Sequence, residues 1–178
     1  MKILFNSVAI MERTKELAGN IMIDYHNRGL VVISVLNGAF MFTADLVRQM
    51  RKPDLTMYFV RASSYKGVVS LGKVEIDRLP LVEIAGKNVL VVEDIVDTGR
   101  TCTTLRERLM IASPLSLKFC ALLDKPSCRE VDFKPDYTGF IIPNWFVVGY
   151  GLDYDEKYRH LPNIYTFEKG RDNVRLTA

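Results

Sequence analysis

Three acidic side chains and a hydroxyl-rich turn stand together in the middle of this chain. Glu93 and Asp94 end an apolar run that begins at Asn88, and Asp97 follows after two apolar residues. The turn reads Asp97-Thr98-Gly99-Arg100-Thr101, and a helical pattern begins after it. Ligands of open α/β sheets bind beyond the carboxyl ends of the strands, so this segment is a candidate binding site.

The residue types of the turn suit a phosphate group. Backbone N–H groups at the start of a helix lack partners within the helix, and together with the helix dipole they favour an anion. Gly99 allows the backbone to approach the anion closely, and the hydroxyls of Thr98 and Thr101 add donors. Glu93 and Asp94 repel phosphate, but they can accept hydrogen bonds from a ribose diol or help to hold a divalent metal ion. These features predict a site for ribose 5-phosphate.

A purely structural interpretation of the same residues is also available. Asp97 can serve as a helix N-cap, and the pair Glu93 and Asp94 can be a solvated turn. For a single carboxylate in a turn that interpretation is the better one. Three carboxylates beside one phosphate-binding turn favour a functional site instead.

The elements that must position this turn alternate between strands and helices. Residues 30–36 form a near-continuous apolar run rich in β-branched residues, which is typical of a strand buried on both faces of a parallel sheet. Residues 63–80 are polar and contain glycine, which predicts a long loop or a loose ribbon. The tail from residue 161 is expected to fold over the C-terminal edge of the sheet together with the N-terminal segment. Helices are predicted over residues 6–28, 39–50 and 101–112, and strands over residues 30–36, 55–62, 88–93, 117–123, 137–142 and 146–150. This alternation predicts an α/β fold with a twisted, mainly parallel sheet flanked by helices.

Composition excludes several classes of protein. The chain has 178 residues, of which 48% are hydrophobic and 25% charged, as in an ordinary globular domain. A net charge of +3 with scattered basic residues disfavours a nucleic-acid partner. The three cysteines form no CxxC pair, which argues against a disulfide framework and a zinc site. With neither a signal peptide nor a membrane span in the sequence, we expect a cytoplasmic protein that has no membrane partner.

Residues 89–101 resemble the phosphoribosyl-pyrophosphate-binding motif of the type I phosphoribosyltransferases. Neither GxxxxGK[ST] nor GxGxxG occurs in the chain, so the Walker and dinucleotide-binding loops are excluded. Four further segments look like those of hypoxanthine(-guanine) phosphoribosyltransferases and occur in that family's order, namely residues 35–40, 62–65, 123–126 and 146–154. The resemblance extends over most of residues 35–162.

The resemblance implies a fold and an activity. It implies one phosphoribosyltransferase domain over residues 1–178, with a core of about 30–150 and a small hood subdomain built from the N-terminal segment and about 150–178. The implied reaction belongs to purine salvage: the 5-phosphoribosyl group of phosphoribosyl pyrophosphate moves to hypoxanthine or guanine, giving IMP or GMP and pyrophosphate. Mg²⁺ is the implied cofactor, and a homodimer or homotetramer is the implied assembly.

The resemblance also implies roles for single residues. Asp97 is implied as the general base at purine N7, and Lys125 as the donor to the 6-oxo group. Phosphoribosyl pyrophosphate is implied to lie on Glu93, Asp94, Asp97, Thr98, Gly99, Arg100 and Thr101, with its pyrophosphate on Asn37, Gly38 and Arg159. The purine is implied to contact Lys125, Phe146, the backbone of Val147 and Asp153. Mg²⁺ is implied to bind Glu93, Asp94 and Asp153. Ser64 and Tyr65 are implied to form a lid. The pyrophosphate loop of this family can contain a non-proline cis peptide.

Other interpretations of these residues stay open at this point. Trp145 and Phe146 can be core aromatics, Lys125 can be a solvated charge, and Arg159 can pair with Asp155 or Glu156 on the surface. Two other functions compete with this one: a regulatory protein that keeps the fold, and a phosphoribosyltransferase that acts on another base. The chain also departs from the family pattern, because many members have lysine where this chain has Asn37 and a smaller or apolar residue where it has Arg100.

Overall fold

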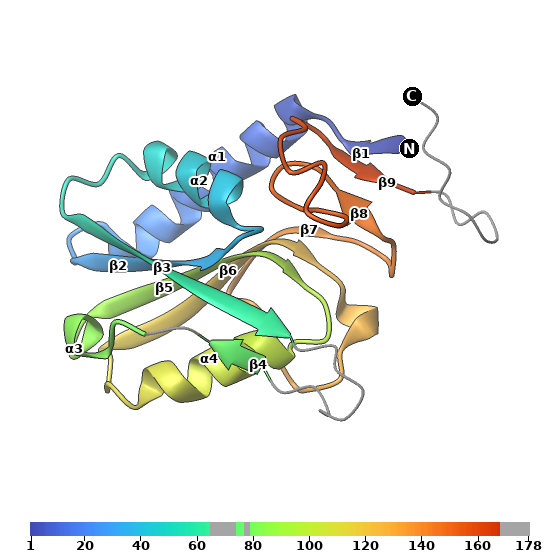
Figure 1. The fold of residues 1–178 in the computed structure, drawn as a ribbon. Coiled ribbons are helices and arrows are strands. Elements are labelled where there is room, and N and C mark those ends of the chain that lie inside the picture. The colour runs from blue at the N-terminus through green and yellow to red at the C-terminus, as the bar shows by residue number, and fades with distance from the viewer. Residues whose placement is uncertain (65–73, 77–78, 168–178) are drawn as a thin grey trace.

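A six-stranded sheet forms the centre of the protein (Figure 1). The computed structural model describes residues 1–64, 74–76 and 79–167, with the backbone alone at residues 63, 64, 74 and 75. Neighbouring strands follow the order β4-β3-β2-β5-β6-β7, and all of these pairs are parallel except β3 with β4. The strands are β2 (Leu30–Leu36), β3 (Leu55–Ser64), β4 (Val74–Ile76), β5 (Asn88–Val96), β6 (Ser116–Asp124) and β7 (Tyr137–Ile141). The predicted α/β fold with a mainly parallel sheet is confirmed.

Helices cover both faces of this sheet. In Figure 1, α1 (Ser7–Tyr25) and α2 (Phe40–Met50) lie on one face, and α3 (Leu81–Ile84) and α4 (Arg100–Met110) lie on the other. Successive side chains of a strand point to opposite faces, so Val32 packs with the core under α1 and α2 while Ile33 packs with the core under α4. Both faces of the central strands are therefore buried, which explains their unbroken apolar sequence.

Helix α1 is shorter than the predicted helix over residues 6–28. Its start is fixed by Asn6, whose side-chain oxygen accepts a hydrogen bond from the backbone N–H of Ala9 at 2.9 Å. Its last buried side chain is Tyr25, and residues 26–29 are exposed. The helix ends where its apolar face ends, because no packing stabilises a further turn.

Strand β5 is longer than the predicted strand over residues 88–93. Its pairing with β6 continues through Ile95 opposite Leu123 and Val96 opposite Asp124. Glu93 and Asp94 therefore lie inside the strand, and the expected turn begins only at Asp97. Strands contain few acidic residues, so Glu93 and Asp94 suggested that the strand ends at this point, whereas it continues to Val96.

Residues 63–80 were predicted as a long loop or a loose ribbon, and the described residues of this range favour the ribbon. Strand β3 extends to Ser64, and β4 returns beside it, with Ala62 opposite Ile76. Tyr65, predicted as a lid residue, lies outside the described residues, and of Ser64 only the backbone is described.

A small second sheet stands beyond the carboxyl ends of the parallel strands (Figure 1). It consists of β1 (Lys2–Phe5), β9 (Ile164–Thr166) and β8 (Val147–Val148), with antiparallel pairing throughout. The predicted strand over residues 146–150 is reduced to two residues, because Gly149 at φ 95° and Tyr150 at φ 50° turn the chain. The division of the chain into a core and a hood stays a prediction. Among the described residues, no helix combines the length and the apolar character needed to cross a membrane.

Candidate active site

Glu93 and Asp94 lie at the carboxyl end of β5, beside a cavity of 680 Å³. Glu93 is only 8% exposed, and its Oε2 atom has no hydrogen-bond partner among the described residues. Burial, together with the charge of Asp94, raises the pKa of Glu93 well above its ordinary value. Burial also raises the pKa of Asp94 to about 6. The solvated-turn interpretation of this pair is therefore wrong.

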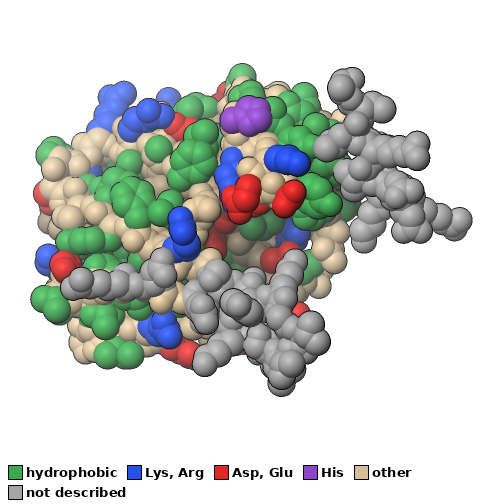
Figure 2. Space-filling model, in the orientation of Figure 1, with side chains coloured by type: hydrophobic (Ala, Val, Ile, Leu, Met, Phe, Trp, Pro, Cys, Tyr) green, Lys and Arg blue, Asp and Glu red, His purple; other side chains and the backbone are tan. Residues whose placement is uncertain are grey.

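The cavity joins segments that are far apart in the sequence. Among the residues that sequence analysis selected, its lining includes Asn37 and Gly38 after β2, Glu93 and Asp94 on β5, Thr101 on α4, and Asp153 and Arg159 near the C-terminus. Acidic and basic side chains gather around a hollow on this face of the molecule (Figure 2). Four of these seven residues have ionisable side chains, so the cavity suits a highly charged ligand.

Gly38 fits closely against Asp94. A Cβ atom on Gly38 would lie 1.7 Å from Oδ2 of Asp94, so only glycine leaves room for this carboxylate. The peptide bond between Leu36 and Asn37 is cis, as the resemblance led us to expect. The loop after β2 thus brings its backbone directly against the acidic end of β5.

Arg159 closes the other side of the cavity. Its Nη2 atom lies 3.0 Å from Oδ1 of Asp153 and donates to Oε2 of Glu156 at 2.9 Å, while Nη1 donates to the carbonyl of Gly151 at 2.8 Å. The Nε atom is buried and has no partner in the described part of the chain. Arg159 therefore pairs with Glu156, as the surface interpretation held, and also lines the cavity.

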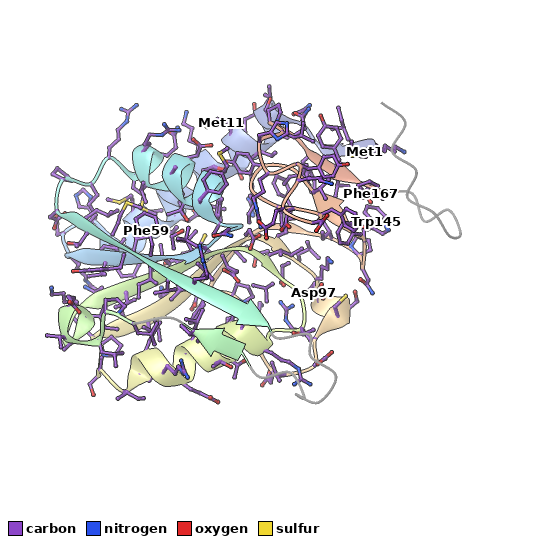
Figure 3. The ribbon with its side chains drawn as sticks, in the orientation of Figure 1. Met1, Met11, Phe59, Asp97, Trp145 and Phe167 are labelled. Carbon is purple, nitrogen blue, oxygen red and sulfur yellow. The ribbon has the colours of Figure 1, made fainter. Side chains whose placement is uncertain are left out.

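Asp97 and Lys125 form an ion pair where β5 and β6 end, and neither residue is among those that line this cavity. Lys125 Nζ lies 3.1 Å from Asp97 Oδ2, and Lys125 is only 6% exposed, so its interpretation as a solvated charge is wrong. Asp97 does not cap α4, because Gly99 occupies that position. Figure 3 shows Asp97 at the carboxyl ends of the parallel strands, with Trp145 beyond it on the side of the second sheet.

Arg129 holds the backbone around this pair, and sequence analysis did not select it. Its Nη1 atom donates to the carbonyl oxygens of Val96, Asp97 and Lys125, and its Nη2 atom pairs with the buried carboxylate of Asp124. One guanidinium thus fixes both loops that carry the ion pair. In the sequence, the one indication of this role is that Arg129 follows Lys125 by four residues. The short 3-10 helix η1 (Pro126–Cys128) brings the two residues close together.

The turn between β5 and α4 has the geometry of an anion-binding loop. Gly99 adopts φ 85° and begins α4 at Arg100, one residue earlier than predicted. The Thr98 carbonyl accepts a hydrogen bond from the Glu130 backbone N–H at 3.0 Å, which anchors the turn. The Arg100 side chain pairs with the carboxylate of the same Glu130. The first N–H of α4, that of Arg100, donates to the Thr98 hydroxyl at 3.4 Å. N–H groups in the first turn of a helix have no partner within the helix, so this turn can bind an anion.

Phe146 lies at the surface of the second sheet. It is 48% exposed and packs edge-on against Tyr154, with 5.6 Å between the ring centroids. Trp145 is 44% exposed, so the interpretation of both rings as core aromatics is wrong. Val147 follows on β8 and is buried. An exposed ring next to a fixed backbone edge can receive a flat aromatic ligand.

Comparison with known proteins gives the family. Residues 2–155 match the family described as "Phosphoribosyl transferase domain". The chain belongs to the phosphoribosyltransferase family. A hypoxanthine phosphoribosyltransferase of Salmonella typhimurium is 43% identical over 167 residues, covering 92% of this chain and 93% of that protein. A crystal structure of a hypoxanthine-guanine phosphoribosyltransferase from Bacillus anthracis has a TM-score of 0.88 and 45% identity, covering 94% of this chain and 99% of the other.

Some relatives are much longer than this chain. The bifunctional protein TilS/HprT of Listeria monocytogenes is 42% identical over 164 residues, which is 92% of this chain. The chain spans about a quarter of the length of that relative, since the match covers 25% of it.

The acidic residues that line the cavity suit a magnesium ion. Among the described residues, no three His, Cys, Asp or Glu side chains converge on one metal position. Mg²⁺ ordinarily takes one or two carboxylates together with substrate phosphates and water, so a complete protein cage is not required. The Oε2 atom of Glu93 has no hydrogen-bond partner among the described residues, and Asp94 lines the same cavity, so both carboxylates can accept a cation.

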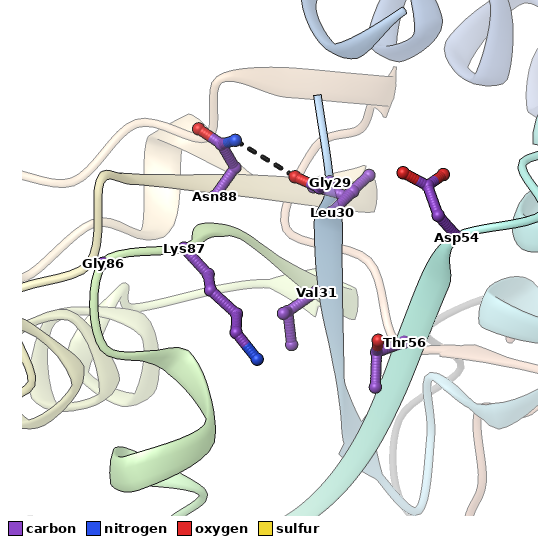
Figure 4. A pocket seen from close by; sticks show the side chains of 8 residues that line it. All are labelled: Gly29, Leu30, Val31, Asp54, Thr56, Gly86, Lys87 and Asn88. Carbon is purple, nitrogen blue, oxygen red and sulfur yellow. Dashed lines mark hydrogen bonds between the residues drawn. The ribbon is translucent and has the colours of Figure 1, made fainter. Parts of the chain in front are cut away.

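A second hollow lies at the opposite end of the parallel strands (Figure 4). It has a volume of 420 Å³, and its wall includes Asn88, whose side chain donates to the Gly29 carbonyl at 3.0 Å. Its charged lining residues are Lys87 and Asp54, and Asp54 already pairs with Lys52 at 2.8 Å. This end faces the amino ends of β2 and β5, away from the ligand-binding edge of an α/β sheet.

Proposed function

We propose that this chain transfers the 5-phosphoribosyl group from phosphoribosyl pyrophosphate to hypoxanthine or guanine, giving IMP or GMP and pyrophosphate. The observation that carries the proposal is that a charged cavity and a separate ion pair both lie at the carboxyl ends of the parallel strands. A charged cavity with acids, a glycine loop and an arginine suits the activated sugar. The pair of Asp97 and Lys125, which follows the carboxyl ends of β5 and β6, suits the polar edge of a 6-oxopurine.

The sugar half of the site follows from charge and backbone geometry. The 5-phosphate rests on the N–H groups of residues 98–101, and Glu93 and Asp94 accept hydrogen bonds from the ribose hydroxyls. The pyrophosphate lies against Asn37, Gly38 and Arg159. Glu93, Asp94 and Asp153 are the residues that would hold Mg²⁺, which offsets negative charge on the leaving group when it is bound.

The purine half follows from donors and acceptors. Lys125 donates a hydrogen bond to the 6-oxo group. The amino group of a 6-aminopurine cannot accept this hydrogen bond, because it is itself a donor. Asp97 accepts the proton that leaves N7 as the new glycosidic bond forms at N9. The purine ring stacks on Phe146, and its edge meets the backbone of Val147 and the neighbourhood of Asp153. Ser64 and Tyr65 are proposed to close over the site.

Location and assembly are further parts of the proposal. Free Cys102 and Cys120, both buried, suit a reducing cytoplasm. Phe40 on α2 and Phe59 on β3 are 37% and 56% exposed, and exposed aromatic side chains of this kind suit a homodimer or homotetramer. Figure 3 shows Phe59 on β3. Light scattering coupled to gel filtration tests the assembly, and a monomer at micromolar concentration would contradict it.

The activity test is direct. The purified chain is incubated with phosphoribosyl pyrophosphate, MgCl₂ and one of hypoxanthine, guanine, xanthine or adenine, and ultraviolet absorbance is followed. We expect turnover with hypoxanthine or guanine and none with adenine. Chelation of Mg²⁺ with EDTA is expected to stop the reaction. Absence of turnover with both 6-oxopurines would overturn the proposed function.

A further inference from the structure

Arg61 lines the same 680 Å³ cavity, and the site described above gives it no role. It stands near the carboxyl end of β3, directly opposite Leu36 in the parallel register of β2 and β3. Leu36 is followed by the loop proposed to bind pyrophosphate, so Arg61 lies beside the start of that loop. Its Nη2 atom lies 3.4 Å from the side-chain oxygen of Asn37.

Alternation along β3 aims Arg61 toward this loop. Val60 is 1% exposed and belongs to the core under α4, whereas Met57 packs with the core under α1 and α2. Arg61 and Met57 are an even number of residues apart, so they share the face of the sheet that α2 covers. The loop of Asn37 and Gly38 leads into α2 on that same face.

The charge balance of the cavity shows what Arg61 can contribute. Among the described lining residues, Glu93, Asp94, Asp153 and Glu156 are acidic, and only Arg61 and Arg159 are basic. The Nη2 atom of Arg159 is already held by Asp153 and Glu156. The hydrogen bond of Arg61, in contrast, goes to the neutral amide of Asn37. Arg61 is therefore the lining cation whose charge no described carboxylate offsets at hydrogen-bond distance.

We propose that Arg61 binds the pyrophosphate group of phosphoribosyl pyrophosphate from the β3 side of the cavity, opposite Arg159. This inference rests on the proposed function and adds a binding residue to it. A guanidinium presents a planar fork of donors that matches phosphate oxygens in a bidentate way. The side chain of Asn37 orients the guanidinium of Arg61, and this guanidinium supplies a positive charge that the neutral Asn37 lacks.

Three ligands separate this role from a general effect on the site. Phosphoribosyl pyrophosphate and inorganic pyrophosphate both occupy the proposed contact, whereas IMP fills the purine and ribose 5-phosphate positions and leaves the pyrophosphate position empty. Calorimetry with the full chain and MgCl₂ measures the Kd of each. For Arg61→Gln we expect the Kd of the first two ligands to rise about 10- to 100-fold, as for the loss of a charge-assisted hydrogen bond. The Kd of IMP is expected to stay within about threefold.

Two further variants test the charge itself. Arg61→Lys keeps a cation at the position and is expected to retain most of the affinity for pyrophosphate. The double variant Asn37→Lys with Arg61→Gln moves the cation across the 3.4 Å contact and is expected to recover affinity relative to Arg61→Gln alone. Arg28→Gln is the matched control, because Arg28 is exposed at the opposite end of the sheet.

The outcomes distinguish this inference from the proposed function. Unchanged affinity of Arg61→Gln for both pyrophosphate ligands, in a wild-type background that binds them and IMP, overturns the role of Arg61 and leaves the proposed function standing. An equal loss of IMP affinity also overturns it, because the effect would then be general. A wild-type chain that binds none of the three ligands overturns the proposed function itself.

Discussion

Lys125 Nζ lies 3.1 Å from Asp97 Oδ2, although the two residues are 28 positions apart in the sequence. Parallel pairing of β5 with β6 places Val96 opposite Asp124, and the next residue of each strand carries the charge. Lys125 is buried, whereas the Asp97 side chain is 46% exposed. A buried donor thus stands beside an accessible acceptor, in the order that O6 and N7 take along the edge of a 6-oxopurine.

Asp97→Asn tests the proposed base. An amide keeps the size of the side chain but cannot take up a proton, so we expect kcat to fall about 10²- to 10⁴-fold. The Kd of IMP should change by no more than about threefold, since the contacts of the bound nucleotide remain. Steady-state kinetics and calorimetry measure the two quantities. Asp132→Asn at an exposed position is the control, and an Asp97→Asn enzyme with wild-type kcat would rule out proton transfer to this residue.

Lys125→Met tests recognition of the 6-oxo group. Methionine retains most of the buried stem but removes the ammonium, so the base loses one charged hydrogen bond. We expect the KM for hypoxanthine to rise about 10- to 100-fold at saturating phosphoribosyl pyrophosphate. The Kd of phosphoribosyl pyrophosphate, which does not touch this side chain in the proposed complex, should stay near its wild-type value. Lys134→Met at an exposed site is the control; an unchanged KM for hypoxanthine in Lys125→Met would count against the assignment.

The sequence predicted the parallel sheet well, because its central strands are buried on both faces and therefore read as apolar runs. It also predicted the acidic segment of β5, since three carboxylates beside a glycine turn are unusual after such a run. It did not predict Arg61 or Arg129. Arg61 looks like any polar residue near a strand end, and it joins the cavity only because β3 pairs in register with β2. Arg129 binds backbone carbonyl groups of two loops, and such contacts leave no residue pattern.

Gly38→Ala tests the close contact between the pyrophosphate loop and Asp94. The new Cβ would lie 1.7 Å from Asp94 Oδ2, so the carboxylate or the loop must move by more than an ångström. Displacement of that size in a site is expected to lower kcat/KM about 10²-fold. The melting temperature should change little, because the carboxylate can move into the adjacent cavity. Gly29→Ala is the matched control, since a Cβ there meets nothing within 4 Å; wild-type kinetics in Gly38→Ala would show that the loop tolerates the methyl group.

The stability of the metal-free protein is expected to depend on pH through Asp94. Burial raises its pKa from an ordinary 3.8 to about 6, so between these values the folded protein binds this proton more strongly than the unfolded chain. Protonated Asp94 therefore stabilises the fold fully below pH 3.8, and this contribution is lost as the pH rises through about 6. Asp94→Asn cannot ionise, so its melting temperature should exceed that of wild type by roughly 2 °C or more at pH 7.5. The difference should shrink toward pH 4.

Adding magnesium and substrate tests whether a cation changes the effect of Asp94 on the melting temperature. A cation beside Asp94 favours the ionised carboxylate, so saturating MgCl₂ with phosphoribosyl pyrophosphate should stabilise wild type more than Asp94→Asn at pH 7.5 and reverse the order of the two melting temperatures. Scanning calorimetry with and without the ligands measures both arms. A melting-temperature difference that is the same at pH 4.5 and pH 7.5 in the metal-free state would show that burial of this carboxylate does not control the stability. An order that persists with the ligands bound would show that the cation does not lie beside Asp94.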